Sequence, residues 1–192
     1  MIEVEISGPI AKKDYEKVKK LLIGAGEGVH TETQVELSYS DKGYNNREVK
    51  IENKDGARIC INTGKMGERK SKITALADNA FSDGVEMLAE LGYRKGIVLA
   101  HDVFLCSYGG AEFTLFEPFD ESYHYHASIF SKNPTEAKEA KQKLEKLSRN
   151  LKLPIWTRND MLTFLEQLNK KERYVYDYEK DGQNYFKEKF GI

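Results

Sequence analysis

The sequence predicts a single α+β domain in which an antiparallel sheet is flanked by helices. Several short segments alternate apolar and polar residues, as half-buried strands do, and turn-forming residues separate them. Other segments repeat apolar residues at helical spacing. A length of 192 residues with 40% hydrophobic residues suits one sizeable core and a charged exterior.

The chain opens with a strand and a surface helix. Between Ile2 and Ile6, apolar residues alternate with Glu3 and Glu5, so the carboxylates and the apolar side chains face opposite sides. Gly8-Pro9 is expected to end this strand. The lysine-rich segment 10–22 then repeats apolar residues at helical spacing, which predicts a surface helix.

The glycine-rich run GAGEG, residues 24–28, is expected to stop that helix. A glycine loop that binds a dinucleotide lies between a strand and the start of a helix. These glycines instead follow a helix, and glycine is the favoured residue just past a helix C-terminus. We therefore interpret the run as a helix stop and a flexible turn.

The next part of the chain is rich in predicted strands. The alternating runs are Thr33–Tyr39, Glu48–Glu52, Arg58–Asn62 and Arg69–Leu76. Between them lie SDKGYNN, NKDG and NTGKMGE, whose Gly, Asn and Asp residues form turns. An antiparallel meander is the natural interpretation.

A helix is expected from about Ser82 to Leu91, with Ser82 as its cap and Gly92 as its stop. Three more strands should follow, in the segments IVLAHDVFLCSY, AEFTLFEPF and SYHYHASIF. Together with the earlier runs, they supply a sheet of many short strands.

The most clearly marked helix begins after Asn133. Asn133 suits the capping position, Pro134 suits the first helical position, and Glu136 follows three residues after the cap. Apolar residues then recur on one face as far as Leu151. A shorter helix is expected from about Asn159 to Asn169.

Residues 170–192 form a charged and aromatic C-terminal extension to a domain that spans residues 1–169. The YVYDY run of this extension could add an edge strand or cover an apolar patch. A partly disordered tail is the alternative, because chain ends are often poorly ordered.

Charge and composition exclude several classes of function. The formal net charge is −1, which provides no global field to recruit nucleic acid or an anionic membrane. No segment approaches the ~18 consecutive apolar residues of a membrane span, and the N-terminus resembles neither a signal peptide nor a transit peptide. We expect a cytoplasmic protein without nucleic-acid or membrane partners.

Cysteines and histidines give no strong signal. Cys60 and Cys106 lie far apart among apolar residues, so we interpret them as small buried hydrophobes. His124 and His126 share one face of a strand, but two ligands are too few for a metal site, which needs three or four. We interpret them as ordinary strand histidines.

The order of elements resembles the CYTH family, also called triphosphate tunnel metalloenzymes. The segment Glu3-Val4-Glu5-Ile6-Ser7 resembles the E-x-E-x-K strand that opens the family's barrel, with Ser7 in place of the lysine. SGPIAKKDYEKVKKLL resembles the first helix of the family, and the segment from NPTEAKEAKQ onward resembles its closing helices. The resemblance covers residues 1–169 and implies an antiparallel β-barrel, closed or partly open, flanked by helices.

Elsewhere the motifs of the family are eroded. Its R-x-R strand is nearest to Lys50-Ile51-Glu52, where the second position reverses sign. The acidic pair expected next falls near residues 69–72, and another near His124–Ser128, and neither segment contains a carboxylate. The resemblance in fold therefore exceeds the resemblance in the site.

The resemblance nevertheless implies a site. Glu3 and Glu5 would hold Mg²⁺ or Mn²⁺, two residues apart on one face of a strand. The phosphate groups would be bound by five cations: Lys50, Arg58, Lys65, Lys70 and Lys72. The competing interpretation of each cation is a solvated surface residue, because lysine and arginine are mostly exposed.

The implied function is metal-dependent hydrolysis of inorganic triphosphate or of a small molecule that carries a triphosphate, by water polarised at the metal. The alternative is a protein of this fold that binds phosphate or a nucleotide without catalysis. Class IV adenylate cyclase activity ranks below hydrolysis, because no adenine pocket is identifiable in the sequence.

Overall fold

The computed structural model describes residues 1–39, 47–54, 56–65, 68–77, 79–118 and 123–192. The strands are β1 (Ile2–Pro9), β2 (Glu27–Tyr39), β3 (Arg47–Asn53), β4 (Ala57–Lys65), β5 (Glu68–Ala75), β6 (Lys95–Tyr108), β7 (Ala111–Pro118), β8 (His124–Ser131) and β9 (Val175–Asp177). The helices are α1 (Lys12–Ala25), α2 (Phe81–Glu90), α3 (Pro134–Asn150), α4 (Arg158–Asn169), α5 (Tyr178–Asp181) and α6 (Tyr185–Phe190).

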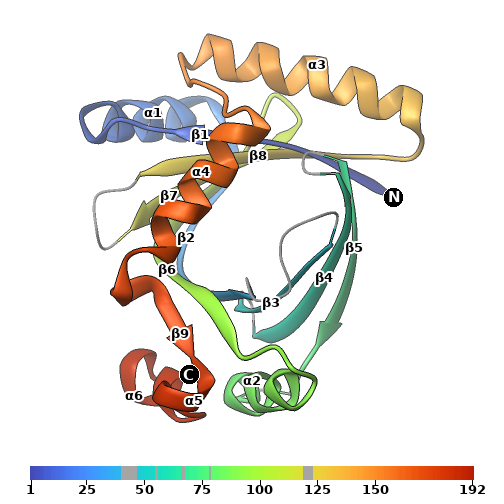
Figure 1. Cartoon of the computed structure of the whole chain (residues 1–192). Coiled ribbons are helices and arrows are strands. Elements are labelled where there is room, and N and C mark those ends of the chain that lie inside the picture. The colour runs from blue at the N-terminus through green and yellow to red at the C-terminus, as the bar shows by residue number, and fades with distance from the viewer. Residues whose placement is uncertain (40–46, 55, 66–67, 78, 119–122) are drawn as a thin grey trace. The chain divides into compact units, whose positions relative to one another are not determined.

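The predicted class is confirmed: a large antiparallel sheet is flanked by helices (Figure 1). Among the described residues the hydrogen-bonded order is β2-β3-β4-β5-β1-β8-β7-β6-β9. Closure of the sheet into a barrel stays a prediction. The turns expected within SDKGYNN and NTGKMGE fall on residues 40–46 and 66–67, outside the described part of the chain.

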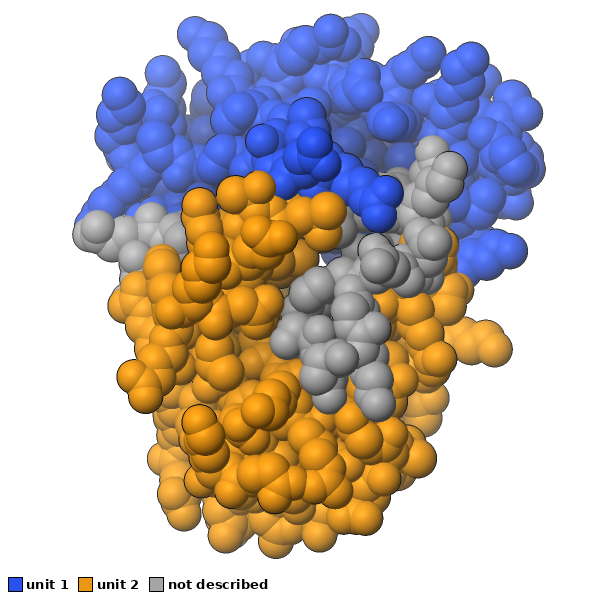
Figure 2. Space-filling view, in the orientation of Figure 1, with its two compact units in different colours: residues 1–33, 65–70, 101–161 blue, residues 34–64, 71–100, 162–192 orange. Residues whose placement is uncertain are grey.

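The chain divides into two compact units, coloured separately in Figure 2. Unit 1 comprises residues 1–33, 65–70 and 101–161, and unit 2 comprises residues 34–64, 71–100 and 162–192. The predicted boundary between residues 169 and 170 stays a prediction.

In unit 1, α1 and α3 cover the apolar face of β1, β8 and β7. Strand β1 pairs along its whole length with β8, from Ile2 opposite Ser131 to Pro9 opposite His124. The core that this face shares with the helices includes Val4, Tyr15, Leu22, Phe113, Tyr125 and Leu144. The alternation at the start of the chain thus has the predicted effect, with Val4 buried and the flanking glutamates on the other face.

The expected break at Gly8-Pro9 is wrong, because β1 continues through both residues. Gly8 is needed here for close packing and not for a turn. A Cβ atom at this position would lie 1.9 Å from the backbone oxygen of Pro154. The segment between α3 and α4 therefore rests directly on the backbone of β1.

Two helix ends in unit 1 follow the predictions. The N–H of Gly26 donates to the backbone oxygen of Leu22 at 2.7 Å, so the glycine-rich run does stop α1, but the flexible turn expected there is wrong because β2 begins at Glu27. At the start of α3, the Asn133 side chain accepts from the N–H groups of Thr135 and Glu136, both at 3.0 Å. Pro134 occupies the first turn as expected.

In unit 2, α2 packs against β3 and the core contains Leu37, Val49, Ile51, Phe81, Val85 and Phe186. The expected Ser82 cap is wrong: α2 starts at Phe81, after Ala80, and no side chain caps it. Gly84 allows the close contact, since a Cβ there would lie 2.5 Å from Ile51 Cδ1.

The C-terminal extension is ordered and contributes to unit 2. Its YVYDY run supplies β9, which pairs antiparallel with β6 from Lys95 opposite Asp177 to Ile97 opposite Val175. The following helix α6 buries Phe186 completely. The extension therefore both adds an edge strand and covers an apolar patch, as predicted, and the alternative of partial disorder is wrong.

Candidate functional site

The strongest cluster of charged side chains lies on β2, β3 and β4 of unit 2. Val49 and Ile51 point into the core, so Glu48, Lys50 and Glu52 share the other face of β3, as the alternation predicted. The register places Glu36 on β2 directly opposite Glu52. Two carboxylates facing each other in this way repel, so the pair requires a cation.

Lys50 supplies that cation. Its Nζ lies 2.7 Å from Glu36 Oε2 and 2.8 Å from Glu52 Oε2. Arg58, opposite Glu52 in the β3–β4 register, donates from Nε to Glu52 Oε1 at 2.6 Å. Two of the predicted phosphate ligands, Lys50 and Arg58, are thus joined through the carboxylate of Glu52.

Neutral polar groups extend this network. Ser38 Oγ donates to Glu36 Oε1 at 2.8 Å, and Asn62 Nδ2 donates to Glu48 Oε2 at 2.8 Å. We call the seven residues Glu36, Ser38, Glu48, Lys50, Glu52, Arg58 and Asn62 the charged network. It holds three carboxylates and two cations on one face of three adjacent strands.

The charged network shifts the pKa of its members in opposite directions. Burial alone would lower the pKa of Lys50, but Glu36 and Glu52 outweigh it and hold the pKa well above its ordinary value. Burial would raise the pKa of Glu52, and Lys50 and Arg58 instead lower it to about 2. Burial raises the pKa of Glu36, making it the carboxyl more easily protonated.

The other three predicted phosphate ligands lie along or beside β5. Lys70 and Lys72 have exposed side chains, the first in unit 1 and the second in unit 2. Lys65 is the last residue of β4, and its side chain lies outside the described part of the structure. The roles of all three stay predictions.

The predicted metal ligands Glu3 and Glu5 lie half-buried on β1 of unit 1, on the face opposite the core. Glu5 Oε2 lies 3.1 Å from Nε2 of His126 on β8. The sequence offered no acidic partner for His126, because the two residues are 121 positions apart and only the strand register brings them together.

His124 belongs to an aromatic cluster. Its ring stacks on Phe116 with centroids 4.4 Å apart, and the ring of His101 lies 5.3 Å away. Within the described residues, no group of three or more His, Cys, Asp or Glu side chains is placed to hold a metal ion. The interpretation of His124 as a packed strand histidine agrees with this arrangement.

The two cysteines are buried, and one of them lies beside the charged network. Cys60 and Cys106 are free and buried, as predicted. Cys60 lies beside the charged network, with Sγ 3.5 Å from Glu52 Oε1, and burial raises its pKa to about 12. None of the described helices has the length and apolar character needed to cross a bilayer.

Solved structures share the fold at low sequence identity. PH1819 from Pyrococcus horikoshii OT3 aligns with a TM-score of 0.69 and 20% identity, covering 88% of this chain and 99% of its own. A "putative adenylate cyclase" from Vibrio parahaemolyticus aligns with a TM-score of 0.61 and 12% identity, covering 85% and 98%.

A third structure, HpAC1 from Hippeastrum, is described as a "putative adenylyl cyclase" with a dominant triphosphatase activity. It aligns with a TM-score of 0.51 and 10% identity, covering 86% of this chain and 95% of HpAC1. No family model matches the sequence, and no curated protein matches it. The resemblance to the CYTH family is thus confirmed by structural neighbours at the level of the fold.

Proposed function

We propose that this protein binds inorganic triphosphate or a small molecule that carries a triphosphate, and hydrolyses it with Mg²⁺ or Mn²⁺. The observation that carries the proposal is the charged network, which places Lys50 and Arg58 together beside three carboxylates on a sheet face of a fold shared with HpAC1. Polyphosphates need several cations in a partly desolvated setting, since charge-assisted hydrogen bonds are strongest there.

Lys50 and Arg58 are the phosphate ligands that we propose within the charged network. Each already binds a carboxylate oxygen, and a phosphate oxygen is likewise an anionic acceptor of charge-assisted hydrogen bonds. A bound phosphate would therefore exchange with Glu36 or Glu52 as the partner of Lys50. Lys65, Lys70 and Lys72 stay candidates for further phosphate contacts.

Glu3 and Glu5 are the proposed metal ligands. Mg²⁺ is often held by one or two carboxylates, with substrate phosphates and water as its other ligands, so two glutamates on one strand face could supply the protein's share of the ligands. The fit requires His126 to release Glu5 Oε2 or to share it. The ion, when bound, would supply Lewis-acid polarisation of a phosphoryl oxygen and of water.

Binding without hydrolysis is the second candidate. It is favoured by the contact between Glu5 and His126, which occupies one of the two proposed metal carboxylates. The cations alone would still bind phosphate. Cyclase activity ranks lower, as no described feature is specific for adenine.

Phosphate release and thermal stability distinguish the candidates. Wild-type protein is mixed with triphosphate or a nucleoside triphosphate, with and without Mg²⁺ or Mn²⁺. We expect millimolar ligand to raise the melting temperature, because it binds the native state alone. We also expect metal-dependent phosphate release, which Glu3→Gln and Glu5→Gln abolish while Glu139→Gln, an exposed change on α3, does not.

The outcomes are separable. A thermal shift without phosphate release would support the binding protein and contradict the hydrolase. If triphosphate still raises the melting temperature of Lys50→Met and Arg58→Gln as it does for wild type, the charged network does not bind the phosphate. The absence of any shift, with or without metal, would contradict both candidates.

A further inference from the structure

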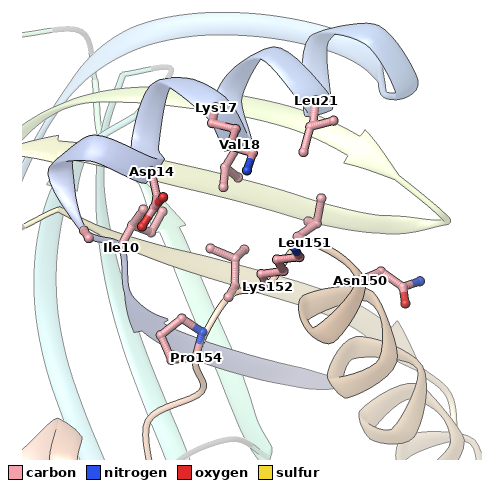
Figure 3. Close-up of a pocket in the computed structure, with 11 residues that line it drawn as sticks. Ile10, Asp14, Lys17, Val18, Leu21, Asn150, Leu151, Lys152 and Pro154 are labelled. Atoms are coloured by element: carbon pink, nitrogen blue, oxygen red, sulfur yellow. The ribbon is translucent and has the colours of Figure 1, made fainter.

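Unit 1 contains a pocket of about 380 Å³ between α1 and the segment that follows α3 (Figure 3). Its floor is apolar: Ile10 and Val18 contribute from the α1 side, and Leu151 and Leu153 from the α3 side. All four residues are buried, whereas Leu21 at the margin is 50% exposed. The pocket lies on the helical side of β1 and has no part in the function proposed above.

Polar side chains border this apolar floor. Asp14 and Lys17 project from α1, Asn150 is the last residue of α3 and Lys152 lies just after that helix (Figure 3). Among the described residues, the side chains of Asp14, Lys17 and Lys152 form no hydrogen bond or ion pair with another part of the protein. The ionised side chains leave the border with one excess positive charge.

The surrounding helices strengthen this positive character. Helix α1 carries five lysines and two acidic residues, and α3 carries five basic and three acidic residues. The whole chain has a formal net charge of −1, so these helices gather positive charge that the rest of the chain offsets. A local field of this kind attracts anions and raises their rate of encounter.

We propose that this pocket binds a small amphipathic anion, with an apolar chain or ring on the floor and one carboxylate or phosphate group beside Lys17 and Lys152. The volume falls within the range of small-molecule pockets, which are mostly apolar with a few polar groups that fix orientation. A purely inorganic anion would bind less well, because it would leave the apolar floor exposed to water. A cationic amphiphile would bind less well because Lys17 and Lys152 would repel it.

Lys152 allows a variant that separates binding from folding. It lies just after α3 with φ of 58°, in the left-handed region that glycine adopts at no steric cost. Lys152→Gly should therefore keep or raise the melting temperature while it removes the charge. Lys17→Gln removes the second cation from an exposed position on α1.

The test uses probes of one chain length that differ in head group: octanoate, octyl phosphate, octyl glucoside and octyltrimethylammonium, with inorganic phosphate as the chain-free control. Binding to the full chain is followed by amide chemical shifts in two-dimensional NMR. We expect both anionic octyl probes to shift residues 10–21 and 150–154, and to bind about tenfold more tightly than the cationic probe.

The affinity of each variant for the anionic probes should change with the charge at the border of the pocket. Lys17→Gln and Lys152→Gly should each weaken the anionic probes about threefold, and Asp14→Asn should tighten them by a similar factor. Lys146→Gln, on α3 but not at the pocket, serves as the matched control and should bind as wild type does. Equal binding of all octyl probes, shifts mapped to other residues, or no binding at millimolar concentration would each overturn the proposal.

Discussion

At the scale of the residue, Glu36 on β2 is the partner that accounts for the position of Lys50 on the polar face of β3. The sequence identified Lys50 and Arg58 as cations on a polar strand face, and the alternation of β3 and β4 supported that assignment. It could not identify Glu36 as their partner, because strand alternation fixes a face but not the register between strands. The partner of Glu5, His126, was missed for the same reason.

Removal of Lys50 should destabilise the fold strongly. Lys50→Met would leave Glu36 and Glu52 facing each other without the cation between them, and both side chains are less than one quarter exposed. We expect a loss of about 2–3 kcal/mol in the free energy of unfolding, below the full cost of breaking a buried ion pair. Urea denaturation measures it.

A double variant tests the cause. Adding Glu36→Gln to Lys50→Met should recover part of the stability, because it removes one of the two opposed carboxylates. If the double variant is as unstable as the sum of the single variants, repulsion between Glu36 and Glu52 is not the reason for the loss.

Glu52 should make stability depend on acid pH. Its pKa in the folded protein is about 2, below the value of about 4.3 in an unfolded chain. The ion pairs of Glu52 therefore stabilise the fold fully above about pH 5, and the contribution is lost as the pH falls toward 2. Glu52→Gln should cost about 2–3 kcal/mol at pH 7 and almost nothing near pH 2.

Urea titrations of wild type and Glu52→Gln across this range measure the difference in unfolding free energy. Glu36 titrates in both proteins, but the charge of Glu52 contributes to its raised pKa, so the comparison is repeated between Glu36→Gln and the double variant Glu36→Gln/Glu52→Gln. A difference that stays constant from pH 7 to pH 3 would show that Glu52 acts through packing and not through its charge.

At the scale of the element, the sequence predicted helix ends correctly where the end depends only on residues a few positions away. The cap of α3 and the glycine stop of α1 depend only on neighbouring backbone groups. Gly8-Pro9 misled the prediction because its role depends on Pro154, which is distant in sequence. Ser82 misled it because it lies two positions after the capping position, which Ala80 occupies, and therefore inside the helix.

The cap of α3 offers a calibrated test at this scale. Asn133→Ala removes the acceptor of two backbone N–H groups and the donor to Glu136 Oε1, which lies 2.7 Å from Asn133 Nδ2. We expect a loss of about 1 kcal/mol in unfolding free energy, measured by urea denaturation. Asn133→Ser should retain most of it, because a serine hydroxyl can accept from the same N–H groups without facing Glu136 with a second carboxylate, and an equal loss in both variants would contradict a capping role.

At the scale of the whole molecule, the order of strands and helices in the sequence predicted the fold class correctly. It did not predict which residues of the C-terminal extension belong to the core of unit 2. The boundary near residue 169 stays a prediction, and residues 170–192 supply β9 and α6 to unit 2. The aromatic residues of the extension were visible in the sequence. Their packing partner Phe81, about one hundred positions earlier, was not.

A substitution at Phe186 tests whether residues 170–192 stabilise the core of unit 2. The Phe186 side chain is fully buried, with ring centroids 5.0 Å from Phe81 and 5.1 Å from Tyr176. Phe186→Ala removes a large core side chain, and such changes cost about 3–5 kcal/mol in unfolding free energy. Amide hydrogen exchange should report the loss as faster exchange in α2 and β3, which share this core.

The matched control is Phe130→Ala in unit 1, where the side chain is 58% exposed and its removal should cost less than about 1 kcal/mol. If residues 170–192 were a dispensable tail, Phe186→Ala would change exchange only within the tail itself and leave α2 and β3 as protected as in wild type. Faster exchange in both elements, with the control unchanged, would instead show that the C-terminal extension stabilises the core of unit 2.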